Sequence, residues 1–148
     1  MRRLLLTCLG MIIAFVSGAQ GVKDPSTWTT KVVPAKDGYD LVFHIALEPK
    51  WHVWALDAGG DGMMIPTSFT FDPGNYSLIG AVREEGKLVV TDMDGIDGKV
   101  RYYSDSADFR QALRGKTGDI VKGSFTYQLC NESICLPPKT QTFSVRIP

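Results

Sequence analysis

The sequence lacks an excess of charge of either sign and has few of the residues that build many enzyme sites. Its 148 residues contain 16 Lys and Arg against 16 Asp and Glu, with two His and three Cys. The charge balance argues against the basic surface that binds nucleic acid, and two histidines identify no Ser-His-Asp set. With 44% hydrophobic and 22% charged residues, the composition is that of one globular domain rather than a disordered chain.

Long apolar runs are also missing, except at the N-terminus. Beyond residue 21 no run approaches the ~20 apolar residues of a membrane helix, so we expect no membrane span in the mature chain. Residues 1–19 have the pattern of a secretory signal peptide, because Arg2 and Arg3 precede a short apolar stretch that ends at Ser17-Gly18-Ala19. An uncleaved anchor is the alternative. We expect an exported chain with a single domain over residues 20–148.

Helical periodicity is hard to find after the leader, and alternating or β-branched runs between Gly, Pro, Asn and Asp predict an all-β domain. The candidate strands are residues 28–33, 39–47, 52–56, 67–71, 77–83, 87–91, 100–104, 120–129 and 140–147. Turns are expected at 36–38, 49–50, 72–75 and 84–86. The exception is 106–113, which fits a short amphipathic helical turn or an edge strand. Many short strands at this spacing predict a sandwich.

Two candidate strands show one face that belongs in the core. Leu41, Phe43, Ile45 and Leu47 share one parity in the second strand, and polar residues mostly take the other. The last strand alternates in the same way, with Phe143 at the start of its apolar face. We expect both faces to contribute to one core.

Loss of the leader removes Cys8 and leaves Cys130 and Cys135 in a compartment where disulfides persist. A hairpin with a four-residue loop would place them opposite each other, with Cβ atoms roughly 4.5–5.5 Å apart, which is close to what a disulfide needs. Cys130 falls in phase with the polar positions of its strand. A bend at Pro137-Pro138 would then reset the phase and place the hairpin near solvent at one end of the sandwich.

Spacing alone leaves three interpretations of the cysteine pair, and it favours a structural disulfide over a redox-active one. A loop this short stabilises a fold by less than about 3 kcal/mol, which weakens the purely structural account. A metal site is third, because no second cysteine pair exists and neither His44 nor His52 is close in sequence. The acidic segment 92–98 does not match the calcium-loop spacing. We expect no metal and no cofactor.

The most informative segment is Tyr127-Gln128-Leu129-Cys130 followed by Cys135-Leu136-Pro137-Pro138. It resembles the active-site hairpin of the N-terminal periplasmic domain of the thiol:disulfide interchange protein DsbD. The resemblance extends more loosely from about residue 28 to 148, through Trp51-His52-Val53-Trp54, Pro66-Thr67 and Val100-Arg101-Tyr102-Tyr103.

This resemblance implies an immunoglobulin-like sandwich in the periplasm with a reversible Cys130–Cys135 disulfide. In the family, the pair receives electrons from a membrane-linked thioredoxin-like domain and passes them to periplasmic oxidoreductases. The implied activity is that of a thiol:disulfide oxidoreductase acting as an electron relay, with Cys135 meeting partners and Cys130 resolving. The resemblance therefore reverses the preference for a structural bridge.

By position, residues 94–99 would match the family's cap loop, which shields the cysteines until a partner docks. Asp94 and Asp97 lie in this loop, and Ile96 would occupy the shielding aromatic position. His52 and Trp54 share a strand face and would match aromatic positions that line the site. Ile96 and His52 depart from the family's aromatics, and one fewer residue separates the cysteines.

Two further expectations concern partners and an alternative function. Because the sequence ends at Pro148 without the membrane and thioredoxin-like regions, we expect a separate membrane electron donor and thioredoxin-like oxidoreductases as partners. Lys139 would favour a thiolate if it lay nearby, although a solvated lysine is the simpler interpretation. The alternative function is a disulfide-stapled immunoglobulin-like binding or interaction module without redox activity.

Overall fold

The computed structural model describes residues 23–148, so the predicted signal peptide at residues 1–19 lies outside the described residues. The strands are β1 (Ser26–Ala35), β2 (Gly38–Leu47), β3 (His52–Gly59), β4 (Ser68–Phe71), β5 (Ser77–Thr91), β6 (Val100–Arg114), β7 (Ile120–Tyr127), β8 (Leu129–Cys130) and β9 (Lys139–Arg146). Within residues 23–148 there is no helix, and hence none that could cross a membrane.

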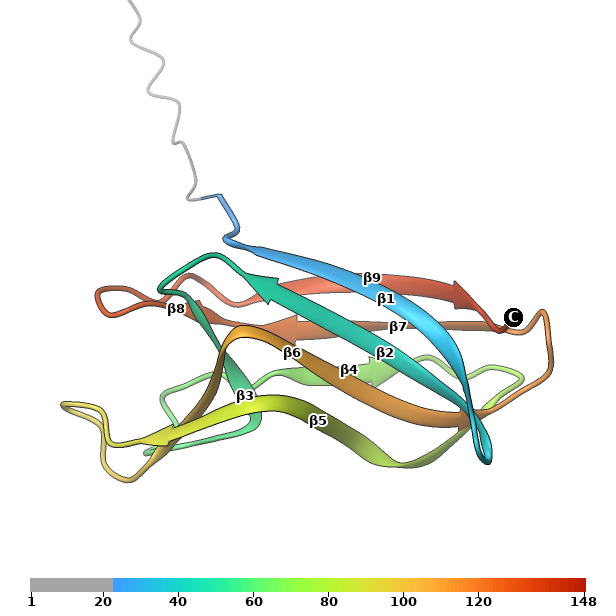
Figure 1. Cartoon of the computed structure of the whole chain (residues 1–148), viewed down its shortest axis with the longest axis horizontal. Helices are drawn as coiled ribbons and strands as arrows, with labels where there is room; N and C mark the ends of the chain where they lie inside the picture. The colour runs from blue at the N-terminus through green and yellow to red at the C-terminus, as the bar shows by residue number, and fades with distance from the viewer. Residues whose placement is uncertain (1–22) are drawn as a thin grey trace, which may run out of the picture.

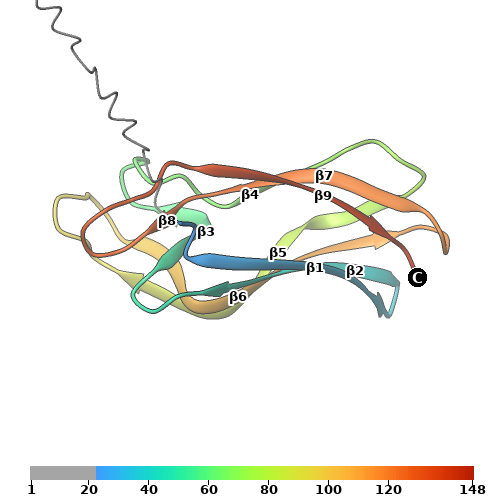
Figure 2. The same cartoon turned by 90° about the horizontal axis from the view of Figure 1, so that it is seen from above.

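The strands form two antiparallel sheets that face each other as a sandwich (Figure 2). The six-stranded sheet has the order β1-β2-β6-β3-β8, with β5 also paired to β6, and the three-stranded sheet has the order β4-β7-β9. The prediction of an all-β, immunoglobulin-like sandwich is confirmed.

Strand β6 is the centre of the larger sheet, and it corrects the prediction for residues 106–113. This segment is neither a helical turn nor an edge strand, because it pairs with β2 on one side and with β5 on the other. Phe109, Gln111 and Leu113 alternate into the core, so pairing on both sides decides a pattern that was locally ambiguous. The earlier part of β6, residues 100–104, pairs with β3 instead of β2.

Strand β5 corrects a second prediction. The two candidate strands 77–83 and 87–91 form one strand, and the segment 84–86 is not a turn. The chain passes through it with register shifts in its pairing to β6 on either side of the segment. Gly86, with φ 151°, replaces the expected reversal with a β-bulge, which bends a strand without ending it.

The main core lies between the two sheets and confirms the predicted inward faces. Leu41, Phe43 and Ile45 are fully buried, and Phe143 is 9% exposed. The ring of Phe43 lies 4.7 to 5.5 Å, centroid to centroid, from three rings of the opposite sheet, those of Phe69, Phe125 and Phe143. Aromatic packing across the interface therefore holds the two sheets together.

Two loops lie together at one end of the sandwich. Figure 1 shows the loop between β5 and β6 at the same end as the loop between β8 and β9, while the C-terminus lies at the other end. The β1–β2 turn lies at the same end as the C-terminus, away from β8. The fold thus brings the predicted cap loop, residues 94–99, to the end that carries the cysteine hairpin.

Candidate functional site

Cys130 and Cys135 form a disulfide, as the sequence predicted, with Cα atoms 4.0 Å apart. The four-residue loop between them is organised by Asn131, whose side-chain Oδ1 accepts hydrogen bonds of 2.9 Å from the backbone N–H groups of Ser133 and Ile134. The sequence carried a signal for this role, because Asn directly after a strand often forms such a turn. The hairpin is therefore ordered by its own loop as well as by the disulfide.

The two cysteines differ in exposure, which corrects the predicted phase of Cys130. Cys130 is 1% exposed rather than on the polar face, whereas Cys135 is exposed. The cause is a change of sheet: β7 ends at Tyr127, and Leu129 and Cys130 pair with β3 of the larger sheet. Strand alternation therefore does not continue from β7 into β8.

Gln128 fixes this crossing between the sheets. Its side-chain Nε2 donates to the carbonyl oxygen of Leu136 at 3.2 Å, and its Oε1 accepts from the backbone N–H of Ile65 at 3.2 Å. The side chain thus ties the returning arm of the hairpin to the loop after β3. Gln128 belongs to the motif that resembles the family, but no local pattern predicted its role, because its partners lie in a distant loop and on the returning arm of the hairpin.

Cys130 belongs to a small hydrophobic cluster at the end of the larger sheet. The buried members of this end cluster are Trp54, Ala58, Met64, Val100 and Cys130, and the partly buried residues packed against it are Met93, Ile96 and Tyr102. Trp54, one of the predicted site-lining residues, is 1% exposed. The structure therefore brings Trp54 and Ile96 into the same cluster as one of the cysteines.

His52 lies next to Cys130 on the neighbouring strand. The two residues are register partners in the β3–β8 pair, and the His52 ring lies 4.4 Å from that of Tyr102 and 4.9 Å from that of Trp54, centroid to centroid. Burial lowers the pKa of His52 to about 4 because an apolar environment disfavours the imidazolium. Its Nε2 has no hydrogen-bond partner among residues 23–148.

The predicted cap loop approaches the site through Ile96. Ile96 is half-buried, whereas Asp94 and Asp97 are exposed. The Ile96 side chain reaches Gly60, where an added Cβ would lie 2.9 Å from Ile96 Cγ2. Beside it, the Lys99 ammonium is 3.0 Å from the Asp92 carboxylate. The loop thus presents its apolar residue to the end cluster and its carboxylates to solvent.

A cavity of about 630 Å³ opens between the cap loop and the cysteine loop. It is lined by Lys50, His52, Asp92, Met93, Asp94, Tyr102, Ser104, Asn131 and Glu132. Of the predicted residues, His52 and Asp94 line this cavity. No sequence pattern predicted Lys50, Tyr102 and Glu132 as lining residues, because only the tertiary fold brings them together.

The contacts of Lys139 do not support a role for its ammonium group in favouring a cysteine thiolate. Its ammonium lies 2.7 Å from the Asp24 carboxylate, and that hydrogen bond is the main reason the pKa of Lys139 is raised. The same carboxylate accepts a hydrogen bond of 2.6 Å from the hydroxyl of Tyr127. Lys139 therefore joins β9 to the start of the described chain.

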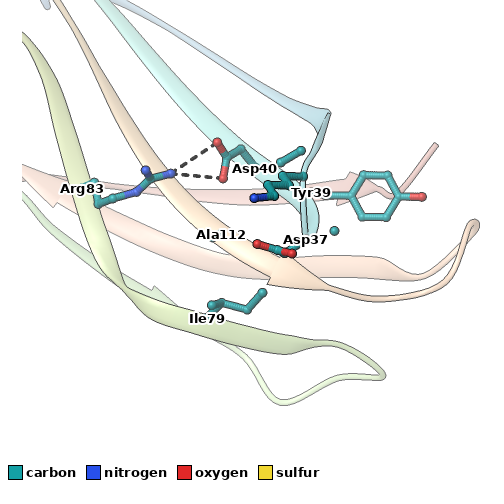
Figure 3. A pocket seen from close by; sticks show the side chains of 9 residues that line it. Asp37, Tyr39, Asp40, Ile79, Arg83 and Ala112 are labelled. Carbon is teal, nitrogen blue, oxygen red and sulfur yellow. Dashed lines mark hydrogen bonds and ion pairs between the residues drawn. The ribbon is translucent and has the colours of Figure 1, made fainter.

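Figure 3 shows a separate cavity of about 400 Å³ beside the β1–β2 turn. Arg83 lies 3.3 Å from the Asp40 carboxylate at its rim. This cavity lies beside the C-terminal end of β6, the end away from the disulfide. Neither a cysteine nor a histidine lines it. We therefore place the candidate site at the cysteine end.

Comparisons with known proteins bear on the family and the fold of the chain. The family described as thiol:disulfide interchange protein DsbD, N-terminal, matches residues 19–147. A solved structure of the N-terminal periplasmic domain of ScsB from Proteus mirabilis has 16% sequence identity and a TM-score of 0.58 over 84% of this chain. The present chain spans 46% of that one.

A second solved structure is the reduced N-terminal domain of DsbD from Neisseria meningitidis, with 18% identity, a TM-score of 0.43, and coverage of 80% of this chain and 84% of that chain. No curated protein matches the sequence. The family match covers almost the whole chain and includes the disulfide hairpin. The chain belongs to the family of N-terminal domains of the thiol:disulfide interchange protein DsbD.

Proposed function

We propose that the chain works in the periplasm as an electron relay between thioredoxin-like proteins, through reversible opening of the Cys130–Cys135 disulfide. Family membership supports a thiol:disulfide interchange domain. Residues 1–19 would be removed on export, after Ala19. Thioredoxin-like oxidoreductases are the partners, and a membrane-linked thioredoxin-like domain is the electron donor.

The observation that carries this proposal is the unequal exposure of the two sulfur-bearing residues. Cys135 is exposed in the loop beside Ile134, which is 48% exposed, whereas Cys130 is 1% exposed. A partner can therefore reach Cys135 without unfolding the domain. Thiol–disulfide exchange depends on access to the attacked sulfur, so Cys135 is the contact point and Cys130 the resolving cysteine.

The exchange is balanced by the partner's own disulfide. In the reduced domain the Cys135 thiolate attacks one sulfur of a partner disulfide, and the partner's second sulfur leaves with the electron pair and takes a proton. Cys130 then attacks Cys135 and releases the partner's first sulfur. Two electrons move to the partner, and the Cys130–Cys135 disulfide forms again.

The cap loop would shield the buried Cys130 in the partner-free state. Ile96 packs against the cluster that contains Cys130, and Asp94 lines the cavity beside the cysteine loop. Asp97 would remain on the solvent side of the cap. In this scheme Trp54 supports the site from the strand below, and docking displaces the loop.

Trapping of the mixed disulfide tests the proposal. The Cys130→Ser variant keeps the exposed thiol of Cys135 and lacks the resolving thiol, so an oxidised thioredoxin-like protein should become covalently attached to it. The matched Cys135→Ser variant should trap far less. Both variants are analysed by mass spectrometry after alkylation. If neither variant forms a covalent complex, the result would favour a disulfide-stapled binding module instead.

A further inference from the structure

Within residues 23–148, His52 is a buried titratable side chain beside the redox pair that the proposed relay leaves without a chemical role. It is 8% exposed and is the register partner of Cys130. Directly opposed residues on antiparallel strands carry side chains on the same face, with Cβ atoms roughly 4.5–5.5 Å apart. The imidazole is therefore within reach of the Cys130 sulfur when the disulfide is open.

Cys130 needs a proton acceptor because of where it lies. It is 1% exposed and packs with apolar residues such as Trp54. Surroundings of this kind disfavour the thiolate, yet the thiolate is the form that attacks. Solvent hydroxide has poor access to such a sulfur. A neutral imidazole on the adjacent strand can accept the proton inside the site.

We propose that His52 accepts the proton of the Cys130 thiol as Cys130 attacks Cys135 in the resolving step. The inference deepens the proposed relay and rests on it for the order in which the two cysteines act. The S–S bond to Cys135 forms, the partner's sulfur leaves with the electron pair, and the imidazolium then gives its proton to that sulfur or to solvent. His52 returns to its neutral form, so each cycle balances.

The surroundings of His52 keep it ready to act as a base. Burial lowers the pKa of His52 to about 4, so the ring is neutral and able to accept a proton at neutral pH. The charged or titratable groups that share its cavity are Lys50 from the β2–β3 loop, Asp92 and Asp94 from the β5–β6 loop, Tyr102 from β6 and Glu132 from the cysteine loop.

Charged groups of both signs in this cavity act on an imidazolium, and the new thiolate adds to the negative ones. The carboxylates Asp94 and Glu132 favour the charged ring, whereas the ammonium of Lys50 opposes it. Attraction between the imidazolium and a thiolate a few ångström away, in a site of low dielectric constant, offsets the cost of burying both charges. The pair is thus charged only while Cys130 reacts.

The test measures the closing step with a small disulfide, so it needs no protein partner. Reduced protein is mixed in a stopped-flow instrument with dithiobis(nitrobenzoate), which loads the exposed Cys135 and releases one thionitrobenzoate. Attack by Cys130 then releases the second, and this later first-order phase measures closure. With His52 as the acceptor, the first-order closing rate should be nearly independent of pH between about pH 6 and pH 8. In His52→Phe it should rise about tenfold per pH unit, because only the thiolate fraction then reacts.

The matched control is His44→Phe, the same change at the chain's other histidine. His44 lies on the outer face of β2, hydrogen-bonded to Asp108 at 2.6 Å, and its variant should keep the flat profile. A wild-type rate that rises about tenfold per pH unit would overturn the proposal even if His52→Phe did not fold. So would equal profiles in wild type and a folded His52→Phe. Failure of the relay itself would show differently, as normal closure with the small disulfide and no exchange with thioredoxin-like proteins.

Discussion

The two hydrophobic clusters of the described domain are covered by different kinds of structure. The main core lies between the sheets, where Phe43 of β2 contacts rings from β4, β7 and β9. The end cluster around Cys130 draws its strand residues from β3, β6 and β8 of a single sheet. Loops such as that carrying Ile96 complete it. Packing between two sheets stabilises the main core, whereas in the proposed scheme a cluster completed by loops would allow a buried sulfur to be uncovered without unfolding.

The largest loss in the free energy of unfolding should follow from a cavity in the main core. Phe43→Ala removes a fully buried ring and should lower the free energy of unfolding by about 3–5 kcal/mol. Chemical denaturation measures this loss. Leu78→Ala, at a side chain 42% exposed on β5, is the control and should change it by less than about 1 kcal/mol. Similar losses in the two variants would show that the core is placed wrongly.

Removal of the disulfide should lower the free energy of unfolding by less than the cavity in the core does. Replacing Cys130 and Cys135 together by Ser removes a cross-link that closes a short loop, which contributes less than about 3 kcal/mol. The double variant should stay folded by circular dichroism and lose all exchange activity. If the double variant unfolded, the disulfide would be structural. The proposed difference in stability between the main core and the end cluster would then be wrong.

Protonation of the Asp24 carboxylate should lower the free energy of unfolding by a smaller amount. Burial raises its pKa, but hydrogen bonds from Lys139, Ser26 and Tyr127 outweigh burial and leave the pKa lowered. Because the folded-state pKa is the lower one, the stabilisation is present above the unfolded value and is lost as pH falls toward the folded value. The loss should be about 1 kcal/mol or less, because this carboxyl is partly exposed and screened.

The measurement for Asp24 is the free energy of unfolding between about pH 5 and pH 2. Asp24→Asn cannot lose a charge in this range, so its curve should fall less steeply than that of the wild type. Parallel curves would mean that the Asp24–Lys139 pair contributes nothing to stability.

The smallest effect on stability should come from the cap. Ile96→Gly removes a half-buried side chain and should change the free energy of unfolding by less than about 1 kcal/mol. Reduction of the disulfide by a small thiol should nevertheless become faster, since exchange depends on access to sulfur. Leu78→Gly is the matched control. Equal reduction rates in wild type and Ile96→Gly would remove the cap from the account.

The same contrast explains how far the sequence could predict the fold. Alternation identified the inward face of β2 through Leu41, Phe43 and Ile45, because a strand with one buried face has a period of two. It could not identify residues 106–113 as part of β6. That segment is strand because β2 and β5 pair with it on both sides, which no local pattern encodes.

The site shows a similar division. Spacing and compartment predicted the disulfide between Cys130 and Cys135, but alternation gave the wrong face for Cys130. The chain changes sheets at Gln128, whose partners include Ile65 in a distant loop. The closeness of His52 to Cys130 follows from the same crossing. Residues on one segment could therefore be assigned from sequence, whereas contacts between segments could not.

The midpoint potential of the Cys130–Cys135 disulfide tests the central claim most directly, because it requires neither a known partner nor a variant. The protein is equilibrated with glutathione or dithiothreitol buffers of defined potential, and the fraction of free thiols is measured after acid quenching and alkylation. A reversible relay should titrate at roughly −180 to −270 mV, in the range of exchange proteins. A midpoint below about −300 mV would mark a structural disulfide and contradict the account.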